Sequence, residues 1–131
     1  MYDKILVAIE ASDEGEQVVK KALDIAKKFD SKVYLISVIS YTLLPKDYQA
    51  KLEEEIVPKM EAIATKYDVS RKRTSVKVGK PYREIIGKAE AIEADLIIMG
   101  THSEKGITGM LGSTANGVAN YAPCDLFLVN I

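Results

Sequence analysis

The chain has 131 residues, 47% of them hydrophobic and 28% charged, with a formal net charge of -1. This length predicts a single domain over residues 1–131 with a hydrophobic core of its own. The nearly balanced charge argues against nucleic-acid binding through bulk charge, and no run approaches the roughly 18 apolar residues of a membrane-spanning helix.

Short apolar or β-branched runs alternate with segments of helical periodicity along the chain. In chain order, the runs of strand length are Lys4–Ile9, Lys32–Ile39, Thr74–Val78, Asp95–Met99 and Asp125–Val129. Apolar residues three or four apart predict helices between these strands. The first begins near Asp13, which has capping-box spacing to Glu16. The second is marked by apolar residues from Leu52 to Ala64 and is kinked or restarted at Pro58. The third is marked by Tyr82–Ile92 with Pro81 at its first position, and the fourth covers roughly Ser113–Tyr121.

Five strands alternating with four helices predict an α/β fold with right-handed crossovers and a mostly parallel sheet covered by helices on both faces. The first, second and fourth runs are almost unbroken apolar, as expected of buried parallel strands. With the common strand order 3-2-1-4-5, the order reverses between the first strand and the fourth. Ligands of such sheets bind beyond the carboxyl ends of the strands at this point, where the turn after Ile9 should face the loop after Met99.

The loop after Met99 is rich in glycine and runs into a helix. Residues 99–114 read MGTHSEKGITGMLGST. Such a loop offers backbone N–H groups and the positive end of a helix dipole to a phosphate, and Ser113 and Thr114 add hydroxyl donors. Ordinary turn and cap residues explain the same pattern without a ligand. The spacing excludes a P-loop, and the first turn, EASDEGE, excludes a dinucleotide fingerprint.

Three segments resemble the universal stress protein family. They are KILVAIEASDEGEQVVKKAL at 4–23, VGKPYREIIGKAEAIEADLIIMGTH at 78–102 and GSTANGVANYAPCDLFLV at 112–129. The likeness extends over nearly the whole chain. The fold of this family is a Rossmann-like, adenine nucleotide α-hydrolase-like sandwich, in agreement with the sheet predicted from the strands and helices.

The glycine motif departs from the pattern of the family's ATP-binding branch, which is G-x-x-G, nine residues, then G-[S/T]. Gly100 and the pair Gly112-Ser113 match, but Ser103 replaces the second glycine and only eight residues separate it from Gly112. Ser103 keeps a backbone N–H, and would be strained if the position needs a positive φ. Gly106 and Gly109 could absorb the shorter spacer.

The resemblance implies a site for ATP, ADP or AMP, with Mg²⁺ accompanying the triphosphate through phosphate oxygens and water. Glu10 stands where the family usually has an aspartate that binds the nucleotide near its adenine and ribose. The resemblance also implies an adenine slot and a set of phosphate-binding residues. The slot would consist of Ala8, Ile9, Val38 and Met99, and the phosphates would lie at Gly100, Gly112, Ser113 and Thr114, with Ser103 in the loop between.

Residues typical of catalysis or metal binding are few. His102 is the only histidine, and one His with one Cys cannot make up a zinc site, so His102 is interpreted as a polar loop residue that touches a phosphate. Lys105 could do the same. We predict no catalytic residue and at most slow ATP hydrolysis. Cys124 has no internal disulfide partner, and with no secretion signal at the start of the chain we expect a cytoplasmic protein.

The last predicted strand, DLFLVNI, is apolar on both faces, and such an edge is usually covered or paired. In the family this strand commonly pairs with its copy, which implies a C2 homodimer. Three functions stay open: an adenine-nucleotide-binding module of the stress response, a dimeric interaction protein that binds no nucleotide, and an enzyme that transfers AMP or phosphate.

Overall fold

The computed structural model describes residues 1–40, 45–101 and 112–131. Its strands are β1 (Lys4–Ala8), β2 (Lys32–Ser40), β3 (Thr74–Gly79), β4 (Leu96–Thr101) and β5 (Asp125–Asn130). Its helices are α1 (Asp13–Phe29), α2 (Lys46–Lys66), α3 (Pro81–Ile92) and α4 (Ser113–Tyr121), with a short 3-10 turn η1 (Arg71–Arg73) before β3. The predicted alternation of strands and helices is confirmed, with strand ends that differ from the predicted ones by one or two residues.

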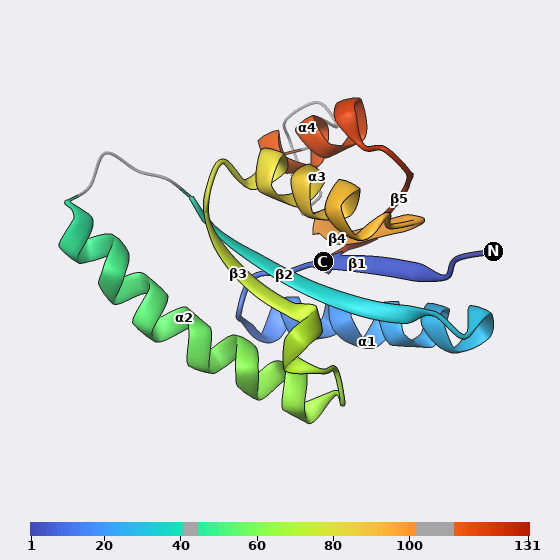
Figure 1. Ribbon diagram of the computed structural model, residues 1–131, viewed down its shortest axis with the longest axis horizontal. Coiled ribbons are helices and arrows are strands. Elements are labelled where there is room, and N and C mark those ends of the chain that lie inside the picture. Colours follow the sequence, from blue (N-terminus) through green and yellow to red (C-terminus); the bar gives the residue numbers. More distant parts are fainter. Residues whose placement is uncertain (41–44, 102–111) are drawn as a thin grey trace.

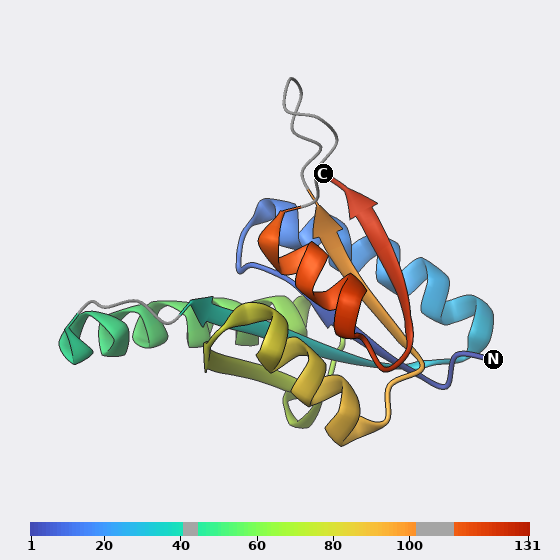
Figure 2. The same cartoon turned by 90° about the horizontal axis from the view of Figure 1, so that it is seen from above.

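The strands form one sheet in the predicted order β3-β2-β1-β4-β5, and every pair is parallel. β1 lies at the centre, where Ile5 pairs with Val33 of β2 on one side and with Leu96 of β4 on the other. Helices α1 and α2 cover one face of the sheet, and α3 and α4 cover the other (Figure 1). Seen from above, β5 forms an outer edge of the sheet (Figure 2).

The core has two layers because successive residues of a strand point to opposite faces. In β1, Ile5 and Val7 pack with residues of α1 and α2, whereas Leu6 and Ala8 pack with residues of α3 and α4. Ile5, Leu6 and Val7 are fully buried. This two-sided burial accounts for the unbroken apolar run in the sequence of this strand.

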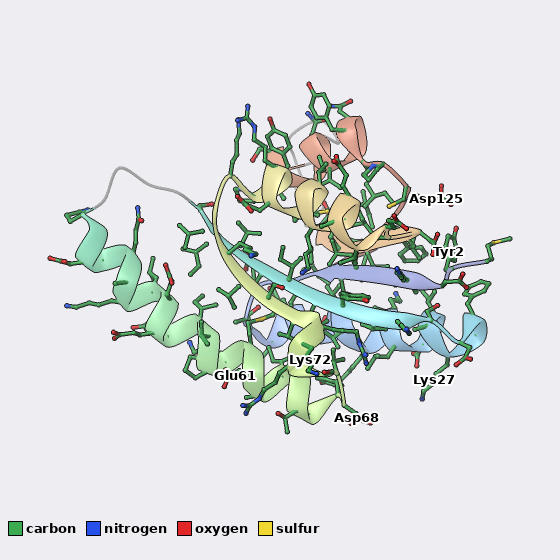
Figure 3. All side chains as sticks on the ribbon, viewed as in Figure 1. Tyr2, Lys27, Glu61, Asp68, Lys72 and Asp125 are labelled. Atoms are coloured by element: carbon green, nitrogen blue, oxygen red, sulfur yellow. The ribbon has the colours of Figure 1, made fainter. Side chains whose placement is uncertain are left out.

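The amino end of β1 is held by side chains from distant parts of the chain. The hydroxyl of Tyr2 donates to Oδ2 of Asp125 over 2.9 Å, and both residues lie at the same end of the sheet (Figure 3). The same end holds Asp95, whose Oδ2 accepts from the backbone N–H groups of Asp3 and Lys4. Asp95 was predicted to begin the fourth strand, but it lies just before β4.

Two predicted helix details are wrong. The residue that caps α1 is Ser12, whose Oγ accepts from the N–H of Gly15 over 3.2 Å, so no capping box forms between Asp13 and Glu16. Of the two alternatives predicted at Pro58, a kink or a restart, the restart is wrong, because helix α2 is continuous from Lys46 to Lys66. Pro58 is exposed on this helix, where water can bind the carbonyl that a proline leaves without a partner.

Within the described ranges, no helix combines the length and apolar character needed to cross a membrane.

Candidate functional site

A pocket of about 460 Å³ opens at the carboxyl ends of β1, β2 and β4. It lies where the strand order reverses beside β1, as the sequence predicted. The first turns of three helices contribute to its wall, because each helix of a parallel sheet begins at this edge. Their contributions are Ser12, Glu14 and Gly15 from α1, Pro81 and Ile85 from α3, and Ser113, Thr114 and Ala115 from α4.

The structure brings most of the predicted site residues together. Nine of them line this one pocket: Ala8, Ile9, Glu10, Val38, Met99, Gly100, Gly112, Ser113 and Thr114. Two further predicted residues, His102 and Ser103, lie outside the described residues, as do Lys105 and the eight-residue spacer. Lining a pocket is a matter of position, so the binding roles of the nine residues stay predictions.

One end of the pocket is apolar. Ile36 and Ile85 are buried there, and Val38 lies half-buried beside them at the end of β2. Met99 closes the floor at 6% exposure. These side chains come from β2, α3 and β4 and form a slot that suits a flat apolar group.

The start of α1 is capped by a side chain of the protein itself and carries negative charge. The N–H of Gly15 donates a hydrogen bond to Oγ of Ser12. The first turn contains three acidic residues, Asp13, Glu14 and Glu16. Because a carboxylate near a helix N-terminus offsets the positive end of the helix dipole, this turn is a poor site for a second anion.

The start of α4 is different. Gly112 is its cap residue, no side-chain hydrogen bond to this cap is found among the described residues, and the first turn holds no acidic residue. The first helical hydrogen bond runs from the N–H of Asn116 to the carbonyl of Gly112, over 2.9 Å. Helix geometry therefore leaves the N–H groups of Ser113, Thr114 and Ala115 without helical acceptors, and all three residues line the pocket.

Gly112 has no described atom close to the place where a side chain would stand. A Cβ built on it would meet no described atom within 4 Å, so packing among the described residues does not explain its lack of a side chain. Its φ of -57° is likewise open to other residues. Open space beside uncapped N–H groups is the arrangement that phosphate sites use at helix starts.

Several pocket residues were missed in the sequence. Ile36 lies two positions before Val38 and therefore on the same side of β2, a signal that strand periodicity offered. Ile131 had no such signal: it follows β5, and its Cδ1 would be 2.7 Å from a Cβ built on Gly100. Its place depends on the register of β5 against β4. The complete set of missed residues is Ser12, Glu14, Gly15, Val18, Ile36, Ser40, Pro81, Ile85, Thr101, Ala115 and Ile131.

The described residues offer neither a metal site nor a reactive thiol. Among the described part of the chain, no group of three or more His, Cys, Asp or Glu side chains is placed to hold a metal ion. Cys124 is half-buried and packs against the core on the α3 and α4 side, as a small apolar residue would. Burial, and then the negative charges of Asp125 and Asp95, raise the pKa of its thiol.

The parallel sheet, with a pocket at its switch point, defines a doubly wound α/β domain. The pocket joins an apolar slot to a helix start that has no side-chain cap among the described residues. Residues 1–130 match the sequence model of the universal stress protein family. The chain therefore belongs to this family, and the resemblance found in the sequence is confirmed.

Relatives support the assignment over the full length. The chain is 33% identical over 140 residues to universal stress protein A homolog 2 of Coxiella burnetii, covering 99% of this chain and 96% of the relative. It is 33% identical over 141 residues to universal stress protein MJ0531 of Methanocaldococcus jannaschii, covering 98% of this chain and 82% of the relative.

Solved structures show the same fold. A universal stress protein in complex with cAMP has a TM-score of 0.74 at 20% identity, covering 98% of this chain and 97% of that one. The structure of hypothetical protein MJ0577 has a TM-score of 0.77 at 28% identity, covering 100% of this chain and 97% of that one. At 20% identity the first likeness shows the fold alone.

Proposed function

We propose that this universal stress protein binds an adenine nucleotide, with ATP as the expected ligand, and acts in the stress response as a nucleotide-dependent binding module. The observation that carries the proposal is the pairing, in one pocket, of an apolar slot with the uncapped start of α4. Nucleotides have the same division into a flat base and a charged phosphate chain.

The base would occupy the slot between Val38, Ile85 and Met99. A purine buries its two faces against such side chains with little loss of hydrogen bonding, because its polar atoms lie on its edge. Glu10 is exposed at the rim of the pocket, where its carboxylate could accept hydrogen bonds from ribose hydroxyls. Its side chain is one methylene longer than that of the aspartate usual at this position of the family.

The phosphates would lie at the start of α4. The N–H groups of Ser113, Thr114 and Ala115 and the helix dipole favour anionic oxygens there, and Gly112 lets the phosphate approach the backbone. The acidic first turn of α1 repels phosphate from the other side of the pocket. Mg²⁺ would accompany a triphosphate and be held mainly by phosphate oxygens and water.

The fold neighbour in complex with cAMP holds an adenine nucleotide on the same fold, so adenine nucleotides are the ligands to test first. Slow hydrolysis at most, and a cytoplasmic location, stay predictions.

The test is the thermal unfolding midpoint of nucleotide-stripped protein with millimolar Mg-ATP, with cAMP, and with GTP as the control. Ligand at about 100 times its Kd adds about 2.7 kcal/mol to the free energy of unfolding, which raises Tm by several degrees. A rise with ATP and not with GTP supports the proposal. A rise with cAMP alone would change the ligand, and no rise with any of the three would contradict nucleotide binding.

A second proposal concerns assembly. We propose a C2 homodimer that forms through β5, because β5 pairs with β4 on one side only among the described strands. The side chain of Phe127 on this edge strand is 42% exposed and offers an apolar ring that a partner strand would cover. If no nucleotide binds, we propose that the protein functions as a dimeric interaction protein through this surface.

A further inference from the structure

The ring of Tyr82 occupies space that a side chain on α4 would otherwise fill. Tyr82 is the second residue of α3, and a Cβ built on Gly117 of α4 would stand 2.5 Å from its Cγ and 2.8 Å from its Cβ. Gly117 is buried. The two helices therefore contact each other through an aromatic ring on one and bare backbone on the other.

Three further side chains hold the ring of Tyr82. Tyr121 at the end of α4 stacks on it, with ring centroids 5.9 Å apart and an angle of 24° between the planes. Nζ of Lys80 lies 4.9 Å from the ring centroid, and Nε of Arg83 donates to the Tyr82 hydroxyl over 3.3 Å. Through this hydrogen bond Arg83 lowers the pKa of Tyr82. The ring has a defined position between α3 and α4.

Both helices of this contact reach the candidate site. Pro81, the residue before Tyr82, lines the pocket, and so does Ser113, which begins α4 one helical turn before Gly117. A helix is stiff over one turn, so a shift of α4 at Gly117 moves its first turn by a similar distance. The phosphate donors of the proposed site lie on that turn.

We infer that Tyr82 is a positioning residue for the phosphate end of the site: its contact with Gly117 sets where the first turn of α4 stands at the pocket. The expected consequence is a selective effect on phosphate binding, and this consequence rests on the proposed function. Ile85 of the adenine slot lies on the same helix as Tyr82, but its side chain is buried in the core with Ile36 and Met99 of the sheet. We therefore expect loss of the Tyr82 ring to leave that end of the pocket in place.

The experiment measures the Kd of Mg-ATP and of adenosine, which lacks phosphates, by calorimetry. Tyr82→Ala should weaken ATP binding about tenfold, the effect of losing a hydrogen bond to a charged group, and leave the Kd of adenosine within about twofold. Tyr82→Phe keeps the ring and should bind both ligands like the wild type. Tyr48→Ala, at an exposed tyrosine of α2, is the matched control.

A second variant guards against a folding defect in Tyr82→Ala. Gly117→Ala pushes the ring off α4 from the other side and should give the same selective loss of ATP affinity. The inference is overturned if both variants bind ATP like the wild type, or if ATP and adenosine are weakened to the same extent.

A measurement without nucleotide separates this inference from the proposed function. The backbone amide NMR shifts of Ser113, Thr114 and Ala115 should change in Tyr82→Ala and stay close to the wild-type shifts in Tyr82→Phe. If the wild type binds neither ATP nor adenosine, the proposed function fails and these shifts alone decide on the role of Tyr82. Unchanged amide shifts in Tyr82→Ala would overturn it.

Discussion

Gly15 at the start of α1 lies directly against the carbonyl oxygen of Glu10, with no room between them for a methyl group. Substitution of Gly15 by Ala should therefore lower the free energy of unfolding by about 1–3 kcal/mol or more, because the turn after β1 must shift. The expected fall in Tm is several degrees.

The control for this prediction is Gly87→Ala on α3, where a Cβ meets no described atom within 4 Å. Alanine at this exposed helical position should stabilise the protein by up to about 1 kcal/mol. Equal Tm values for the two variants would contradict the tight turn at Gly15.

Glu16 joins α1 to α2, since its Oε1 accepts from Nζ of Lys66 over 2.8 Å and from the hydroxyl of Tyr67 over 3.0 Å. Glu16→Gln should lower Tm at pH 7 by a small amount, because the side chain of Lys66 is 62% exposed and water weakens the ion pair. Glu55→Gln, at an exposed position of α2, is the control.

The contribution of Glu16 should depend on pH. The hydrogen bond from Lys66, and then that from Tyr67, lower the pKa of Glu16 below its ordinary value of 4.5. At a given acidic pH the folded state then holds fewer protons than the unfolded state, so the stabilisation is complete above that ordinary value. It is lost as the pH falls through the lowered pKa. The difference in Tm between wild type and Glu16→Gln should shrink over this range, and a constant difference would contradict the prediction.

Gly112 is the position at which to separate ligand binding from folding. Gly112→Val should weaken ATP binding about tenfold or more, since the new side chain would occupy the space beside the uncapped N–H groups. Without nucleotide, its free energy of unfolding should stay within about 1 kcal/mol of the wild type, the usual range for a change of cap residue. Unchanged ATP affinity would remove the proposed site.

The control for Gly112→Val is Gly87→Val, the same substitution at a glycine that also has open space around it but lies away from the pocket. This variant should bind ATP like the wild type.

Phe127 tests the proposed dimer. Phe127→Asp places a charge on the exposed edge of β5, and a buried unpaired carboxylate is costly, so the variant should be monomeric at micromolar concentration by light scattering. Val57→Asp, at an exposed apolar residue of α2, should leave the mass unchanged. A monomeric wild type would sink the prediction.

Cys124 should react slowly with thiol reagents. Burial and two nearby carboxylates raise the pKa of its thiol, so less thiolate is present at pH 7 than in a free cysteine. The alkylation rate of the folded protein should be lower than that of the same protein in urea, and should keep rising at pH values where the unfolded chain has levelled off. A folded protein that reacts as fast as the unfolded chain would contradict the raised pKa.

The fold could be predicted because its signals are local. Unbroken apolar runs indicated β1, β2 and β4, which are buried on both faces. The alternation of strands with helices predicted that the sheet is parallel. The cap of α1 was less certain in principle, since Ser12 and Asp13 are neighbours and both residue types cap helices well. The restart predicted at Pro58 does not occur, because a proline on an exposed helix face can be tolerated.

The site could be predicted only in part. Its strand-end and helix-start residues follow from the switch-point rule and the family motif, and they do line one pocket. Pro81, Ile85 and Ile131 reach the same pocket only through the packing of α3 on the sheet and the register of β5, which no local pattern records. The contact between Tyr82 and Gly117 is of the same kind, because it joins two helices that are separated in the chain by β4.

The central place of β1 has a consequence for how the protein folds. Its pairing with β2 joins residues about 30 positions apart, as in Lys4 with Lys32, whereas its pairing with β4 joins Ile5 to Leu96. A growing chain can thus assemble β1, β2 and β3 early, but the other edge of β1 stays open until β4 has been synthesised. Chains that pause before that point expose the unpaired apolar edge of β1. This edge is the part of the unfinished sheet at which a chaperone would be needed most.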